Sequence, residues 1–184
     1  MDPSKRAEVQ KEVVAFVTEY RAETQRAAVI LIAAKMDSLL VQLVQKALLP
    51  CTVSQDDLLE GDGPLSTFSA RIGLCHRLGL IDGEFTRALH LIRRIRNSFA
   101  HELVGATLDS GPHRDRITEL ASVLEEYESF QKLQHVISSG LTRPVGMFFA
   151  VAAIMIMRLH LAIASTGRLP ATTVQLVPSN WEKK

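Results

Sequence analysis

A basic segment near the middle of the chain carries the side chains best suited to chemistry. From Arg87 to His101 the sequence holds four arginines and two histidines and no acid. An ideal helix turns about 100° per residue, which places four of the polar residues within an arc of about 60°, with the other three no more than about 40° from His90. They are His90, Arg94, Asn97 and His101, and Arg87 and Arg93 flank them. A cationic face of this kind can contact phosphates. The candidate nucleic-acid-binding residues are therefore Arg87, His90, Arg93 and Arg94.

The same face has a plainer interpretation, in which it is solvated and neutralised by a neighbouring helix. The segment 117–129 contains four glutamates and no basic residue, so a neutralising neighbour exists in the sequence. The glutamates are Glu119, Glu125, Glu126 and Glu128. Both interpretations stay open at this stage.

Arg96 differs from the other arginines because it lies about 40° from Ile92, at the edge of the apolar stripe. A buried arginine needs a partner, since an unpaired buried charge costs several kcal/mol. Asp37 is the best candidate, because it shares a helical face with Ile30 and Val41 and also needs pairing. We therefore predict an ion pair between Asp37 and Arg96, with their side chains within about 6 Å.

Arg96 and His101 also form an Arg-x4-His spacing. Short motifs of this kind are frequent by chance, and Arg71 and His76 repeat the spacing. Five residues turn an ideal helix by about 500°, so the two side chains point about 140° apart. They can act together only if the helix ends before His101 or if a partner subunit supplies one of them.

The apolar spacing around these residues predicts an all-α fold, a single-domain bundle of about six helices. The expected helices are about 4–20, 27–49, 66–78, 82–99, 112–137 and 144–167. Ser66 and Asp82 are expected N-caps, and Gly79 is an expected C-terminal cap. The second, fourth and last helices should be central. Residues 1–167 form the domain, and 168–184 form an extended or disordered C-terminal tail.

Composition narrows the function classes. The chain has 184 residues, 47% hydrophobic, with 21 basic and 20 acidic side chains, which excludes a strongly basic nucleic-acid coat and a disordered chain. Two cysteines and no zinc spacing predict no metal and no cofactor. The N-terminus lacks a signal-peptide core. The longest apolar run, 144–157, is shorter than the roughly 20 residues of a membrane helix. We expect a cytoplasmic protein with no membrane contact, and a homodimer through the last helix.

Three segments of the sequence resemble a known family. They read GDGPLSTFSARI at 61–72, LGLI at 78–81 and IRRIRNSFAH at 92–101. Together they resemble the mannitol operon repressor family of bacteria, most densely over residues 59–102. The Arg-Asn-x-x-Ala-His ending also resembles the HEPN superfamily, the all-α domains of many RNA-cleaving toxins and defence proteins.

The two resemblances imply different functions. The repressor family implies a non-catalytic regulator that represses gene expression without a recognisable helix-turn-helix, through a protein partner or through RNA or DNA. The HEPN superfamily implies a metal-independent endoribonuclease whose site forms at a dimer interface. There His101 would be the general acid or base, Arg96 would stabilise the charge on phosphorus, and Asn97 would orient the phosphate or His101. The regulator is our first hypothesis and the nuclease the alternative, with a pure protein-interaction module as a third.

Overall fold

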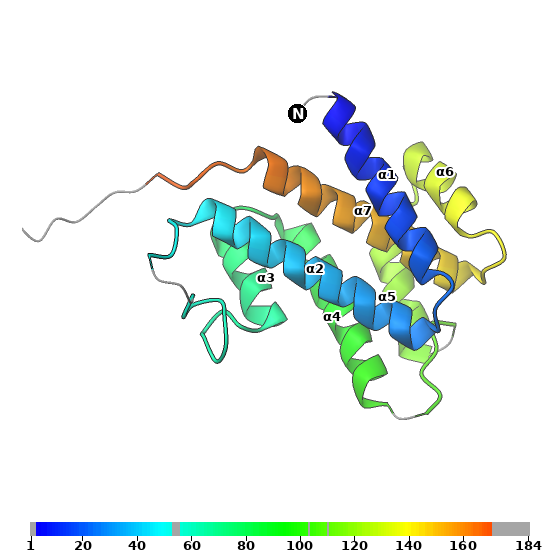
Figure 1. Cartoon of the computed structure of the whole chain (residues 1–184). Helices are drawn as coiled ribbons and strands as arrows, with labels where there is room; N and C mark the ends of the chain where they lie inside the picture. The colour runs from blue at the N-terminus through cyan, green and yellow to red at the C-terminus, as the bar shows by residue number, and fades with distance from the viewer. Residues whose placement is uncertain (1–2, 53–55, 103, 110, 171–184) are drawn as a thin grey trace, which may run out of the picture.

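The computed structural model describes residues 3–52, 56–102, 104–109 and 111–170. Within these residues the chain forms a single all-α bundle of seven helices and no strand (Figure 1). The prediction of an all-α bundle is therefore confirmed, with one helix more than expected. The helices are α1 (Pro3–Tyr20), α2 (Gln25–Ala47), α3 (Phe68–Arg77), α4 (Gly83–His101), α5 (Gly111–Ser122), α6 (Glu128–Ile137) and α7 (Arg143–Ser165).

The additional helix arises because the segment predicted as one helix over 112–137 is divided. After α5 the backbone tightens, and the amides of both Leu124 and Glu125 donate to the carbonyl of Ala121, at 2.8 and 3.0 Å. The side-chain amide of Gln131 then donates to the carbonyl of Glu125 at 2.8 Å. Both α5 and α6 pack against α7, and the break lets each short helix turn its own apolar side toward it.

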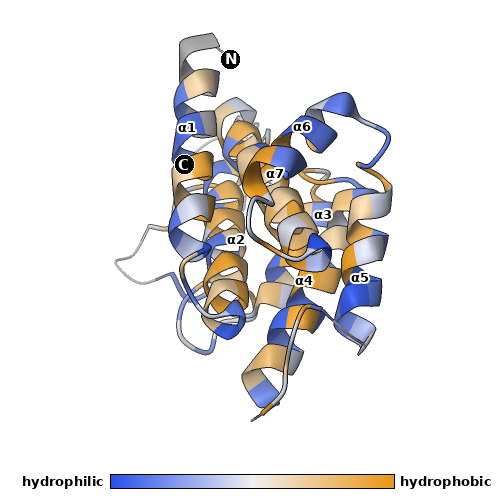
Figure 2. Cartoon of the chain, turned by 90° about the vertical axis from the view of Figure 1, so that its right-hand side faces the viewer, coloured by the Kyte–Doolittle hydropathy of each residue, from blue (hydrophilic) through white to orange (hydrophobic). Residues whose placement is uncertain are grey.

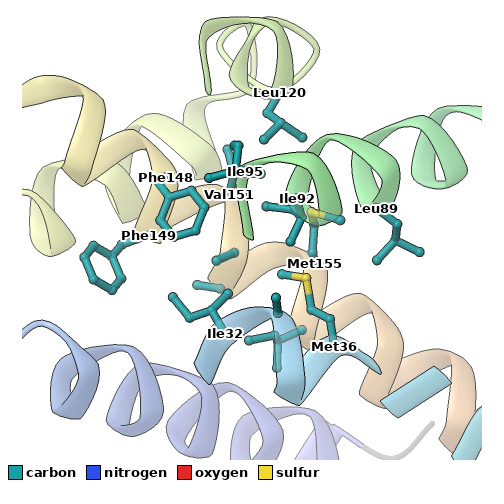
Figure 3. Close-up of a cluster of buried hydrophobic side chains, with 14 of the residues drawn as sticks. Ile32, Met36, Leu89, Ile92, Ile95, Leu120, Phe148, Phe149, Val151 and Met155 are labelled. Carbon is teal, nitrogen blue, oxygen red and sulfur yellow. The ribbon is translucent and has the colours of Figure 1, made fainter. Parts of the chain in front are cut away.

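The core lies between α2, α4 and α7, as the sequence predicts. Figure 3 shows Ile32 and Met36 of α2 converging with Ile92 of α4 and Met155 of α7. All four side chains are buried. Most residues of α2 and α7 are hydrophobic (Figure 2), and each of these helices packs against several others.

By length and composition alone, α2 and α7 could each cross a membrane. Half or slightly more of the apolar window of each helix is buried inside the bundle, 50% for α2 and 56% for α7. A buried core helix passes the same test of length and hydropathy, and α2 and α7 pack against each other and against other helices of the bundle.

Local capping sets where α3 ends and α4 begins. Gly79 has a φ of +69°, and the amide of Leu80 reaches back to the carbonyl of Cys75 at 2.9 Å, which closes α3. Asp82 caps α4, accepting a 2.8 Å bond from the amide of Phe85. Both caps agree with the sequence prediction. The expected cap at Ser66 is wrong, because the hydroxyl of the next residue, Thr67, accepts the bond that begins α3.

The chain beyond α7 is described only to residue 170. The amide of Leu169 donates to the carbonyl of Ala47 at 2.9 Å, so this stretch runs past the end of α2. The rest of the predicted tail, 171–184, lies outside the described residues.

Candidate functional site

The polar face of α4 is the candidate functional site. Leu89, Leu91, Ile92, Ile95 and Phe99 of α4 are buried, and the helix packs against α2, α3 and α5. The predicted basic residues lie outside this buried set, and Arg96 lies at its edge. Arg87, Arg94, Arg96 and His101 are exposed, and His90, Arg93 and Asn97 are partly buried.

Arg87 at the beginning of this face is neutralised by α5. Its Nε donates to Oε1 of Glu119 at 2.7 Å. The interpretation in which the acidic segment neutralises the basic face is thus confirmed for this arginine. The other paired glutamates of that segment go elsewhere: Glu125 faces Arg143 at 3.4 Å and Glu128 faces Lys132 at 2.7 Å.

Further along α4 the charge is not neutralised. Among the described residues, Arg93, Arg94 and Arg96 form no ion pair with any carboxylate. The Nε of Arg93 and the Nδ1 of His90 are buried and have no hydrogen-bond partner in that part of the chain. Burial, and then the charges of Arg93 and Arg94, lower the pKa of His90. The second half of the face is therefore a concentrated positive surface that lacks a counter-charge among the described residues.

The predicted ion pair between Asp37 and Arg96 is wrong. Asp37 instead accepts two bonds from Nη1 of Arg71 on α3, at 2.9 and 2.8 Å. Arg96 is exposed, and its Nη1 donates to Oδ1 of Asn97 at 3.0 Å. The error has a simple cause: α2 packs against both α3 and α4, and helical periodicity does not say which of the two Asp37 faces.

Arg96 and His101 do not converge within one chain. Helix α4 continues through His101, with the amide of Glu102 still donating to the carbonyl of Ser98 at 2.8 Å. The first condition for joint action, a helix that ends before His101, is therefore not met. Five helical residues leave the two exposed side chains about 140° apart, so a shared site would require a second copy of the chain.

Two residues that the sequence analysis missed hold the end of α4 in place. Arg26 of α2 donates to the carbonyls of Phe99 and Glu102, the latter at 2.6 Å. His113 of α5 is buried, with its ring centroid 5.1 Å from that of Phe99 and its Nε2 3.7 Å from the carboxylate of Glu102. Burial lowers the pKa of His113, against the opposing influence of Glu102. A helix C-terminus leaves carbonyls without partners. Arg26 lies 73 and 76 residues from the two carbonyls in the sequence, a contact that helical periodicity does not reveal.

The chemistry of the face is that of guanidinium and imidazole groups. Guanidinium groups bind anions, and an imidazole can also transfer protons. In the part of the chain that the structure describes, no group of three or more His, Cys, Asp or Glu side chains could hold a metal ion.

Comparison of the chain with protein-family models, with curated proteins and with solved structures found no match.

Proposed function

We propose that this protein is a non-catalytic cytoplasmic regulator that contacts nucleic acid through the second half of α4. One observation carries the proposal: Arg93 and Arg94 have no acidic partner among the described residues, while Arg87 on the same helix is paired with Glu119. Arg94 is exposed and Arg93 is partly buried, and unpaired guanidinium groups of this kind favour phosphate oxygens. The resemblance of 61–72, 78–81 and 92–101 to the mannitol operon repressor family supports a regulatory role.

The geometry favours contact with the phosphate backbone over reading of bases. In a helix-turn-helix the first residues of the second helix reach the base edges. Here the N-cap of α4, Asp82, and a residue of its first turn, Glu84, are both acidic. The first arginine of the helix, Arg87, is bonded to Glu119 of α5. The unpaired arginines come about two turns later. Phosphate contacts position a protein on nucleic acid but do not specify sequence, so a protein partner or nucleic-acid shape would supply the specificity.

The salt dependence of binding tests the proposal. Fluorescence anisotropy would measure the affinity for a single-stranded RNA and for a duplex DNA over a series of salt concentrations. The quantity compared is the slope of the logarithm of the binding constant against the logarithm of the salt concentration. We expect Arg93→Gln and Arg94→Gln each to make this slope shallower, by about 0.7 on single strands or about 0.9 on duplex for each phosphate that the variant no longer neutralises. Arg87→Gln is the matched control, because its charge is already neutralised. Salt-independent binding, or an equal effect of all three variants, would contradict the proposal.

The second candidate function is a metal-independent endoribonuclease. The observation that favours it is the exposure of Arg96, which is not held by Asp37 and can approach a phosphate. His101 is exposed just over one turn further on. Because the two side chains diverge within one chain, this function requires a homodimer in which one subunit supplies Arg96 and the other His101.

A further inference from the structure

A cleft lies between α4, α5 and α7, and it shares Arg87 with the basic face of α4 but includes none of the unpaired arginines of that face. Its cavity volume is about 440 Å³. The floor is made of four buried apolar side chains, Leu91, Leu120, Val151 and Met155. Its lining comes from the first turns of α4, from α5 and from the middle of α7.

The charges around the opening are not equivalent. Arg87 and Glu119 neutralise each other across it. Asp82 accepts the bond that caps α4, and Glu84 lies in the first turn, where the positive end of the helix dipole stabilises a carboxylate. Arg158 of α7 is exposed at the opening, and within the described residues it has no hydrogen bond or ion pair. Glu84 and Arg158 both lack an ion pair among the described residues, but the helix dipole stabilises the Glu84 carboxylate, so the guanidinium of Arg158 is the less compensated of the two charges.

We propose that this cleft binds a small amphipathic carboxylate, with its aliphatic body on the apolar floor and its carboxylate on Arg158. The volume falls in the range of roughly 300–1,000 Å³ that is typical of small-molecule sites. Pockets of this kind combine apolar walls with a few polar groups that fix the orientation of the ligand. A planar guanidinium matches a carboxylate in a bidentate geometry, whereas it repels an amine. The site does not depend on the nucleic-acid surface and would exist without it.

Isothermal titration calorimetry with hexanoate, octanoate and decanoate tests the proposal on the full chain without nucleic acid. We expect saturable binding of one ligand per chain, tighter by about fourfold for each added methylene group that reaches the floor. Arg158→Gln should weaken binding by about fivefold at every chain length and leave the dependence on length unchanged. Arg114→Gln, an exposed arginine of α5 outside the cleft, is the matched control.

Two further measurements separate the charge from the apolar floor. Ala88→Leu adds a side chain to the wall of the cleft and should abolish binding, with circular dichroism verifying the fold. Octanol and octylamine should bind more weakly than octanoate. Equal binding of octanol and octanoate, an unaltered affinity in Arg158→Gln, or no saturable binding of any of the carboxylates would each overturn the proposal. If none of the carboxylates binds, the alternative is that the cleft binds an apolar segment of another protein.

Discussion

Arg71 of α3 holds Asp37 of α2 through two hydrogen bonds from one nitrogen, at 2.9 and 2.8 Å. The same guanidinium donates to the carbonyl of Leu65 at 2.8 Å and to that of Leu59 at 3.2 Å. Its side chain is 12% exposed and that of Asp37 27%. One arginine therefore joins two helices and the loop that precedes α3, and it satisfies two carbonyls of that loop.

Replacement of this arginine should be costly. We expect Arg71→Ala to lower the free energy of unfolding by about 2–3 kcal/mol, because it leaves the Asp37 carboxylate partly buried and unpaired. The residual exposure of Asp37 keeps the value below that of a fully buried pair. Arg96→Ala, on the exposed end of α4, should change the stability by less than about 0.5 kcal/mol. Urea denaturation measures both, and a larger loss in Arg96→Ala than in Arg71→Ala would contradict this assignment.

Two glycines in helices should respond to alanine in opposite directions. A Cβ at Gly146 of α7 would lie 2.6 Å from the Cβ of Ser138, whereas a Cβ at Gly73 of α3 would meet nothing within 4 Å. We expect Gly146→Ala to destabilise the protein by about 1–3 kcal/mol, because α6 must move away from α7. Gly73→Ala should stabilise it by about 0.5–1 kcal/mol through helix propensity.

Thermal denaturation of the two variants makes the comparison direct. The double variant Gly146→Ala with Ser138→Gly removes the obstructing side chain and should recover part of the lost stability. If Gly146→Ala is as stable as the parent protein, the close approach of α6 to α7 is not as described.

Stability should decline on mild acidification. Burial is the largest cause of a lowered pKa at His90, His113 and His160. When the folded pKa lies below the ordinary value of 6.5, the unfolded chain binds more protons, so the free energy of unfolding rises with pH in this window. The stability from these groups is complete above about pH 6.5 and is lost as the pH falls through the lowered values.

Urea denaturation at about pH 7.5, 6.0 and 5.0 measures this dependence on either side of the ordinary histidine pKa. His113→Gln should make the loss of stability on acidification smaller, because a buried group that resists protonation has been removed. The control is His76→Gln, on the exposed surface of α3. This variant should show the same dependence of the free energy of unfolding on pH as the parent protein. An unaltered slope in His113→Gln would show that the ring is not the group responsible.

What the sequence predicts well is what depends on neighbours along the chain. The apolar stripe of α4, its cap at Asp82 and the end of α3 at Gly79 follow from local spacing and backbone preference. The acidic segment that neutralises Arg87 was predictable too, because charge of one sign on consecutive turns favours a counter-charge nearby.

What the sequence could not predict depends on which helices meet. Asp37 needed a cation, but only the packing of α2 on α3 selects Arg71 rather than Arg96. The apolar stripe continues in the sequence from α5 to α6, but the helix breaks between them. The two short helices pack against α7 separately, which the sequence does not reveal. The cleft that Arg158 borders exists only where three helices meet, so periodicity within any one of them gives no sign of it.

The last prediction concerns catalysis. Purified protein should leave total RNA intact in EDTA, because Arg96 bonds Asn97 and projects about 140° away from His101 within one chain. Denaturing gels would detect cleavage, with Arg96→Ala and His101→Ala beside the parent protein. Cleavage that both folded variants lose would contradict the non-catalytic proposal and favour the nuclease. In that case an equal mixture of the two inactive variants should regain about a quarter of the parent activity, because about half of the dimers formed at random would be mixed, and each of these would hold one complete site out of two.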